Sequence, residues 1–350
     1  MTKFLLQIIM KTLKRLLLVA LLTTSLAPIT TVAQVPLPPQ VPIWDANKVE
    51  LALHKIADGV YAVIPTTAER ETTKGIPQAT TGGFIIGDKG VLMIETMLTK
   101  RLYDQQIKLL RNITQKPILY AVNTSDHGDH CFTNYLLPAS TLIIQNEFAK
   151  ENLRQNYAGI KQFMVTLFGS GRGIEATTFR PADITIAKNN SLKLDLGGGK
   201  VVEFLNGGTA QSPADLFVWL PSAKTFWAGN PFIAEAPTIP WLFDGYFLEP
   251  AANLRKMYDF LPADAIVVPG HGRVTTKAGI KYTIDYVAAL QSQVEAAVNQ
   301  GLTLEQTRQA VTLREFDKGY VLFQWLHSNF NLPNAYKDIS TNKATGKREP

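Results

Sequence analysis

The chain has 350 residues, 46% of them hydrophobic and 18% charged, so it can bury a core and lies outside the composition of disordered proteins. Its formal net charge is +6, but residues 1–33 hold four cations and no acid, which leaves a net charge of +2 for the rest. That remainder has no basic block, which excludes the charge pattern of a nucleic-acid-binding protein.

The first 33 residues combine scattered cations, an apolar run over 16–22 and small residues just before position 34. This order predicts a secretory signal peptide over 1–33. We therefore expect an exported protein, periplasmic or extracellular, with no stable membrane insertion after cleavage; an uncleaved anchor is the alternative. The single cysteine, Cys131, excludes an intrachain disulfide and is either a reactive thiol or a small packed residue.

Four prolines in residues 34–43 predict an extended linker. Residues 44–275 alternate short apolar runs with helical segments, which predicts an α/β domain of two stacked sheets with helices outside. Strands are expected at 60–64, 84–86, 91–94, 118–122, 141–144, 184–186, 192–194, 201–205, 216–220, 225–228 and 266–268, and helices at 102–110 and 147–157.

The last part of the chain has a different pattern. Residues 276–336 keep helical spacing of apolar side chains and predict a helical extension, in which Thr303 and Gln306 can form a capping box. Residues 337–350 are polar, and we expect them to be disordered.

Metal-ligand chemistry is concentrated in residues 123–131, which follow the predicted strand 118–122. His127, Asp129 and His130 lie within four positions of one another, where a strand-end loop can point them at one ion. His271, flanked by two glycines, follows the predicted strand 266–268. Imidazole and carboxylate ligands of this kind suit zinc or iron.

These segments resemble the metallo-β-lactamase superfamily. Residues 125–130, 208–215, 229–230 and 269–272 are similar, in the same order, to that family's His-x-His-x-Asp-His motif, its middle histidine segment, its Gly-Asp pair and its final Pro-Gly-His-Gly. The similarity covers roughly residues 50–275. It implies a four-layer αββα sandwich for residues 44–275, followed by the helical extension.

The departures from the family pattern concern one of its two metal sites. The first site would be formed by Ser125, His127 and Gln211, and the first and last of these are poor ligands. Asn230 stands where the family has a bridging carboxylate. The resemblance implies that the second site keeps all its ligands, namely Asp129, His130 and His271. We therefore expect one metal per chain, zinc in the first place, with iron and manganese as alternatives.

The resemblance implies a hydrolase in which one metal and its water attack an ester, lactone, thioester or amide, with catalytic roles for Asp129 and His127. The alternative is a non-catalytic periplasmic protein that binds a ligand or a metal on the same fold. We expect a small-molecule substrate and leave the oligomeric state open. Candidate substrate-binding residues are Trp241 and Tyr246, for which core packing is the alternative, and Arg172, which otherwise belongs to a solvated loop.

Overall fold

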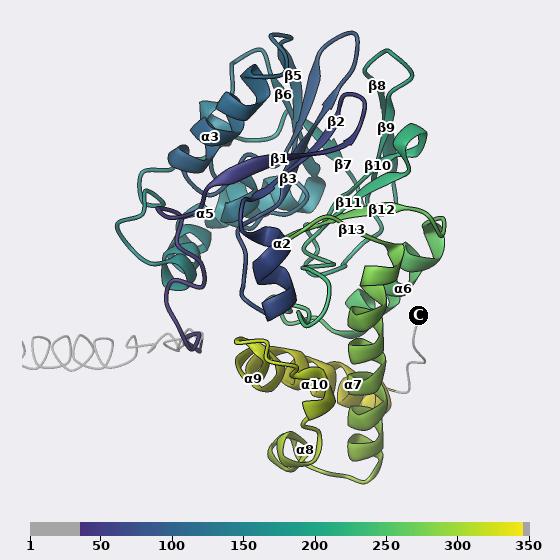
Figure 1. Cartoon of the computed structure of the whole chain (residues 1–350). Coiled ribbons are helices and arrows are strands. Elements are labelled where there is room, and N and C mark those ends of the chain that lie inside the picture. The colour runs from purple at the N-terminus through teal and green to yellow at the C-terminus, as the bar shows by residue number, and fades with distance from the viewer. Residues whose placement is uncertain (1–35, 346–350) are drawn as a thin grey trace, which may run out of the picture. The chain divides into compact units, whose positions relative to one another are not determined.

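The computed structural model describes residues 36–345, so the predicted signal peptide (1–33) lies outside the described residues. The fold described below belongs to the compact unit Leu37–Pro350. Figure 1 shows its two sheets with helices on either side and further helices at the C-terminal end.

The first sheet holds seven strands in chain order. They are β1 (Leu51–Ala57), β2 (Val60–Pro65), β3 (Gly82–Ile86), β4 (Val91–Ile94), β5 (Ile118–Val122), β6 (Leu142–Asn146) and β7 (Ile184–Ile186). The strands from β1 to β4 pair antiparallel, and those from β4 to β7 pair in parallel. The chain therefore leaves the parallel strands β4 and β5 at the same edge of the sheet.

The second sheet has six strands in the order β13-β12-β11-β10-β9-β8. They are β8 (Ser191–Asp195), β9 (Val201–Leu205), β10 (Phe217–Leu220), β11 (Thr225–Gly229), β12 (Ile266–Pro269) and β13 (Thr275–Thr276). Only β11 and β12 pair in parallel. The carboxyl ends of these two strands therefore also lie side by side.

The core lies between the two sheets. Buried side chains from the first sheet, such as Ile85 and Leu92, form one apolar cluster with Phe204 and Trp227 from the second. Alternate residues of a strand face the same side, so both sheets present an apolar face to this layer. The predicted pair of stacked sheets is confirmed.

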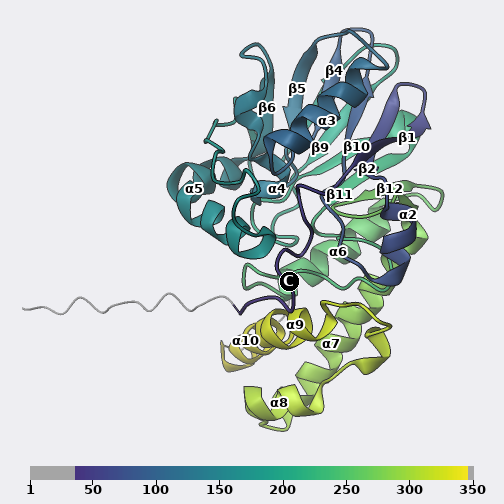
Figure 2. The ribbon, with the colours of Figure 1, turned by 60° about the vertical axis from the view of Figure 1, so that its left-hand side comes forward.

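Helices cover the outer faces of the sandwich (Figures 1 and 2). Helices α3 (Lys100–Arg111) and α5 (Glu147–Phe168) lie against the first sheet, and α6 (Leu248–Phe260) lies by the second. Phe260 of α6 packs on Trp219 of β10, with ring centroids 5.9 Å apart. The result is the predicted four-layer αββα arrangement.

Helix α5 is longer than the predicted helix 147–157. The side chain of Asn146 accepts a hydrogen bond from Phe148 N (2.8 Å) and so caps the start of the helix. The helix continues past Gly159, and its second half buries Met164 and Phe168. It ends at Gly169, whose φ of +80° most residues avoid.

The predicted helical extension is confirmed. It contains α7 (Lys281–Asn299), α8 (Leu304–Ala310), α9 (Phe323–Leu326), a π-helical stretch (His327–Asn331) and α10 (Leu332–Thr345). Thr303 and Gln306 form the predicted capping box at the start of α8. The prediction of disorder over 337–350 is wrong for residues 337–345, which belong to α10, because Ile339 is buried and the Asp338 carboxylate accepts a hydrogen bond from Phe247 N (2.9 Å).

Short helical segments complete the described chain. They are α2 (Ala68–Glu71), α4 (Gly128–Cys131) and the 3₁₀ turns Thr72–Lys74, Asn134–Leu136, Pro221–Ala223, Lys277–Ile280 and Arg314–Phe316. In the part of the chain that the structure describes, none of the helices combines the length and apolar character needed to span a bilayer.

Candidate metal centre

Three strand ends bring the predicted metal ligands together. Asp129 and His130 lie on the short helix α4, which follows β5, and His271 follows β12 two residues after its end. Asn230 follows β11 directly. The glycine at position 229 lets the end of β11 pack closely against Thr124, since a Cβ at that position would lie 2.4 Å from Thr124 Oγ1. The site therefore lies where the two sheets present their strand ends to each other.

Asp129, His130 and His271 form a group of three potential ligands whose donor atoms all lie within 4.8 Å of one another. Asp129 Oδ2 is 3.7 Å from His130 Nε2 and 3.5 Å from His271 Nε2. Ligand atoms placed tetrahedrally around zinc at roughly 2.0–2.2 Å lie about 3.4 Å apart. Within residues 36–345, this is the one group of three or more His, Cys, Asp or Glu side chains with such spacing.

The far nitrogens of both imidazoles have acceptors of their own. His271 Nδ1 lies 3.0 Å from the carbonyl oxygen of Gln78, and His130 Nδ1 lies 3.0 Å from Glu95 Oε1. A carbonyl oxygen can only accept, so the His271 contact places a proton on Nδ1, whereas the His130 contact with Glu95 is a charge contact without hydrogen-bond geometry. Both Nε2 atoms then face the centre of the site, as in histidine ligands held by a partner behind them.

Burial and charge act in opposite directions on these groups. Burial lowers the pKa of His271 to about 4 despite the neighbouring Asp129. Burial would raise the pKa of Asp129, but His130 and His271 lower it below its ordinary value. Burial would lower the pKa of His130, but Glu95 and Asp129 raise it. Two buried carboxylates thus flank one imidazole, an arrangement that requires nearby positive charge.

Asn230 supplies a fourth donor atom. Its Oδ1 lies 3.0 Å from His130 Nε2 and 3.1 Å from His271 Nε2, while its Nδ2 lies 3.2 Å from His127 Nδ1. Thr80 donates a hydrogen bond to Asp129 Oδ2 (2.6 Å). Neutral His271, ionised Asp129 and the amide oxygen therefore direct lone pairs at one point. Asp129, His130 and His271 fit a divalent metal held by three protein ligands, and Asn230 lies beside the position left open for water.

The three residues at the first family site are not arranged as a metal site. The Ser125 hydroxyl accepts a hydrogen bond from His127 N (3.2 Å), and Gln211 Nε2 donates to the carbonyl oxygen of Trp241 (2.6 Å). His127 Nε2 lies 3.3 Å from Asp244 Oδ2. Each of the three side chains thus has a protein partner at one of its polar atoms, while Gln211 Oε1 is buried without one.

His127 remains beside the site. Burial would lower its pKa, but Asp244 outweighs this effect and, with Asp126 and Asp129, raises the pKa to about 10. Its ring is fixed between Asp244 and the amide of Asn230.

The turn that carries Gln211 is held by a buried acid. Asp215 Oδ2 accepts hydrogen bonds from the backbone nitrogens of Gln211 and Ser212, the second at 2.7 Å. Its Oδ1 is buried and has no hydrogen-bond partner among the described residues. Burial raises the pKa of Asp215 to about 7.

A cavity of about 10 Å³, room for about one water molecule, opens onto the site, and its walls are mainly apolar. Its walls come from α5 and from the loop after β11, and they include Phe163, Met164, Phe168, Trp241 and Phe243 together with His127, Asp129 and His271. Trp241 packs against the His271 ring with centroids 4.9 Å apart. No lysine or arginine is among the described residues that line this cavity.

The other two candidate substrate-binding residues lie elsewhere. Arg172 donates from Nε to Asp45 Oδ1 (3.0 Å) and from Nη1 to the carbonyl oxygen of Ser170 (3.1 Å), and it does not line the cavity. Tyr246 is 39% exposed and does not line it either. Cys131 is buried, and burial raises its pKa well above the ordinary value, which favours the packing alternative over a reactive thiol.

The helical extension holds the loop that carries Trp241 and Asp244. Asn331 Nδ2 donates to the carbonyl oxygen of Pro240 (2.9 Å), and Tyr320 accepts a hydrogen bond from Trp241 Nε1 (2.7 Å). Asn334 Nδ2 donates to the carbonyl oxygen of Leu242 (2.8 Å), and Lys337 contacts that of Gly245. Residues 240–247 are therefore fixed to helices that lie far away in the sequence.

Sequence reasoning missed Glu95, Gln78 and Asp244 as partners of the site. Glu95 occurs in a segment that resembles an early strand of the family, but no spacing connects it with His130. Asp244 lies among the aromatic residues of segment 241–247, which includes the candidate substrate-binding residues Trp241 and Tyr246. Its position beside them in the sequence is the one signal that could have pointed to it.

No family model matches the chain, and no curated protein matches it either. Among solved structures, the inverting sec-alkylsulfatase Pisa1 from Pseudomonas sp. is similar, with a TM-score of 0.60 and 17% identity over 86% of this chain and 52% of its own. TMB-1 has a TM-score of 0.52 and 16% identity over 68% of this chain and 97% of its own. The DIM-1 metallo-beta-lactamase has a TM-score of 0.49 and 18% identity, with coverages of 68% and 97%.

The chain spans about half the length of the alkylsulfatase that it matches. At these identities the likeness concerns the fold, and the two matches with TM-scores above 0.5 carry the conclusion. The chain has the metallo-β-lactamase fold with additional C-terminal helices, and this prediction is confirmed.

Proposed function

We propose that this chain is an exported hydrolase that uses one divalent metal, zinc in the first place, to cleave an ester, lactone, thioester or amide. The observation that carries the proposal is the group of Asp129, His130 and His271, whose donor atoms lie within 4.8 Å of one another. Gln78 and Glu95 support it, because they turn both imidazoles toward the same point. A bound divalent metal would supply Lewis acidity and lower the pKa of a water molecule.

The remaining chemistry falls to the protein's own side chains. Thr80 holds Asp129 Oδ2 through its hydroxyl proton (2.6 Å), and so fixes the carboxylate toward the two histidines. His127 lines the cavity and is fixed by Asp244 and Asn230. We assign His127 to orienting the polar group of the substrate, at the place where the family has a ligand of the first metal.

The lining of this small cavity, rather than its volume, supports a neutral and compact acyl group as the substrate. Aromatic and aliphatic side chains form most of its wall, the described lining residues include no lysine or arginine, and the cationic imidazole of His127 already has Asp244 as its anionic partner. Helix α5 and Trp241 cover the site and keep bulk water away from it. A small apolar ester or lactone fits this environment better than a substrate with a free carboxylate or sulfate.

The experiment below also tests two other functions, sulfate-ester hydrolysis and binding without catalysis. The likeness to an alkylsulfatase over 86% of this chain adds a sec-alkyl sulfate to the substrate panel. The loss of good ligands at Ser125 and Gln211 keeps the non-catalytic, ligand- or metal-binding protein as the second candidate.

The function is tested on protein loaded with zinc, iron or manganese. A panel of short-chain aryl ester, lactone, thioester, amide, β-lactam and sec-alkyl sulfate is followed with the parent, Asp129→Ala and the exposed control Asp264→Ala. We expect turnover of a neutral acyl substrate that Asp129→Ala abolishes and Asp264→Ala retains. Metal binding without turnover of any substrate would instead support the binding protein. Sequencing the N-terminus of protein recovered from the periplasm or medium tests export, and a start after Ala33 is expected.

A further inference from the structure

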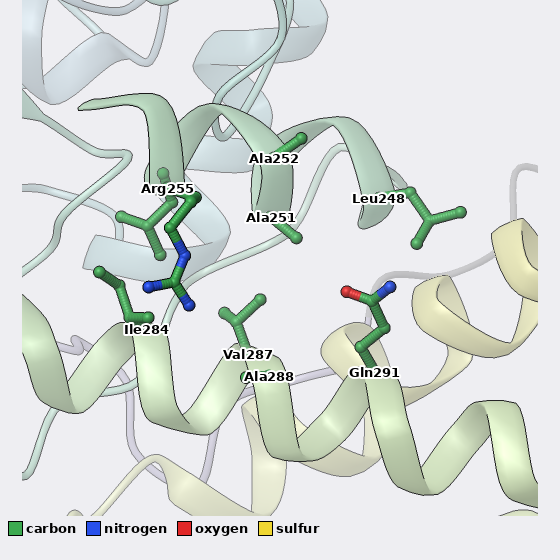
Figure 3. A pocket seen from close by; sticks show the side chains of 9 residues that line it. Leu248, Ala251, Ala252, Arg255, Ile284, Val287, Ala288 and Gln291 are labelled. Atoms are coloured by element: carbon green, nitrogen blue, oxygen red, sulfur yellow. The ribbon is translucent and has the colours of Figure 1, made fainter. Parts of the chain in front are cut away.

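A groove outside the metal site runs between α6 and α7 (Figure 3). Its volume is about 190 Å³. Aliphatic side chains from both helices form its walls, among them Leu248, Ala251 and Leu254 of α6 and Ile284, Val287 and Ala288 of α7. The groove therefore offers apolar surface on two sides.

A second and much smaller cavity, of about 10 Å³, adjoins the groove, because both are lined by Ala251, Leu254 and Val287. This cavity is also lined by Ala210, Pro231 and Leu242. These are the chain neighbours of Gln211, Asn230 and Trp241 in the candidate metal centre. The apolar space therefore leads from the surface toward the backbone behind the site.

Arg255 provides a positive charge at the groove. It is exposed and has no hydrogen bond or ion pair with any residue that the structure describes. Figure 3 shows its guanidinium extending from α6 toward α7, with the side chain of Gln291 pointing into the gap farther along α7. Arg255 is thus available to a ligand.

We propose that this groove binds a medium-chain aliphatic monocarboxylate. The carboxylate lies against the guanidinium of Arg255, which suits its two oxygens through paired N–H donors. The chain extends from Arg255 past Val287 toward Leu248 (Figure 3), where each buried methylene adds affinity. The proposal does not depend on the reaction at the metal centre, since none of the three metal ligands lines the groove.

Calorimetric titration with sodium octanoate tests the proposal on the full chain. Asp129→Ala is titrated in parallel with a chelator present, so that a carboxylate bound to metal is not counted. We expect one saturable site per chain in both proteins. Octan-1-ol and octylammonium, which have the same chain without the anion, are expected to bind at least about tenfold more weakly. No saturable binding, or equal binding of octanol, would overturn the proposal.

Matched variants locate the site. Arg255→Gln is expected to weaken octanoate binding about tenfold, whereas Lys256→Gln, the same charge change at the next and exposed position of α6, leaves it unchanged. Ala288→Trp fills the groove from an exposed position on α7 and is expected to abolish binding. Thermal unfolding checks that each variant is folded. Unchanged affinity in a folded Arg255→Gln or Ala288→Trp contradicts the proposal.

Discussion

The buried carboxyl of Asp215 makes the stability of the fold depend on pH in a direction that can be worked out. Its pKa is raised by burial to about 7, compared with an ordinary value of 3.8. Between these values the folded protein keeps a proton that the unfolded chain has lost. The folded state therefore binds more protons, and the free energy of unfolding falls as pH rises through this interval.

The magnitude follows from the two pKa values. A pKa difference of one corresponds to about 1.4 kcal/mol, so ionising Asp215 in the folded state costs about 4 kcal/mol above pH 7. Between pH 5 and pH 8 the free energy of unfolding therefore falls by about 3 kcal/mol. Asp215→Asn keeps one oxygen to accept from Gln211 N and Ser212 N but has no proton to lose.

Urea unfolding of the parent and of Asp215→Asn at pH 5, 6, 7 and 8, with a chelator present, measures the effect. The stability of the variant relative to the parent is expected to rise by about 3 kcal/mol from pH 5 to pH 8. Asp264→Asn is the control. Lys224 lowers the pKa of this exposed acid, so Asp264 is ionised in the folded and in the unfolded protein throughout pH 5 to 8. The stability difference between Asp264→Asn and the parent is therefore expected to stay constant over this range. A constant difference for Asp215→Asn as well would refute the reasoning.

Two further predictions concern residues that support the site. Glu95→Gln removes the charge that holds His130 Nδ1, and the metal affinity is expected to fall roughly 10- to 100-fold in competition with a chromophoric chelator; an unchanged affinity would contradict the assigned partner. Asn331→Ala removes the donor to Pro240 O, and we expect a loss of about 1–3 kcal/mol in unfolding free energy together with faster hydrogen exchange over 240–247. If hydrogen exchange in Asn331→Ala became faster only outside residues 240–247, Asn331 would not be the residue that holds this loop.

The sequence allowed much of the fold and the metal ligands to be predicted because both depend on local patterns. Short apolar runs marked the strands, and polar side chains clustered where two of them end. Asp129 and His130 are adjacent in the chain, and the glycines around His271 pointed to a strand-end turn. Such signals lie within a few residues of the position that they describe.

The partners of the ligands could not be predicted in this way. Glu95 lies 35 positions before His130, and Gln78 lies 193 positions before His271, so no periodicity or spacing relates them. Glu95 and His130 meet because β4 and β5 are neighbours in the first sheet, and Gln78 and His271 meet only when the two sheets pack together. The same holds for Asp244, which reaches His127 through a loop.

The ends of two helices were misjudged for a related reason. The first of these helices was predicted over 147–157 only, and the polar composition of residues 337–350 suggested disorder. In the folded protein α5 gains burial of Phe168 over the site, and Asp338 of α10 binds the backbone at Phe247. Tertiary contacts therefore outweigh local propensity at both positions.

The central claim is that the chain holds one metal through Asp129, His130 and His271. Metal analysis of purified parent protein, beside Asp129→Ala and the surface control Asp264→Ala, tests it directly. We predict about one equivalent of metal in the parent and in Asp264→Ala, and none in Asp129→Ala. Two tightly bound equivalents in the parent, or no metal in any of the three proteins, would contradict it.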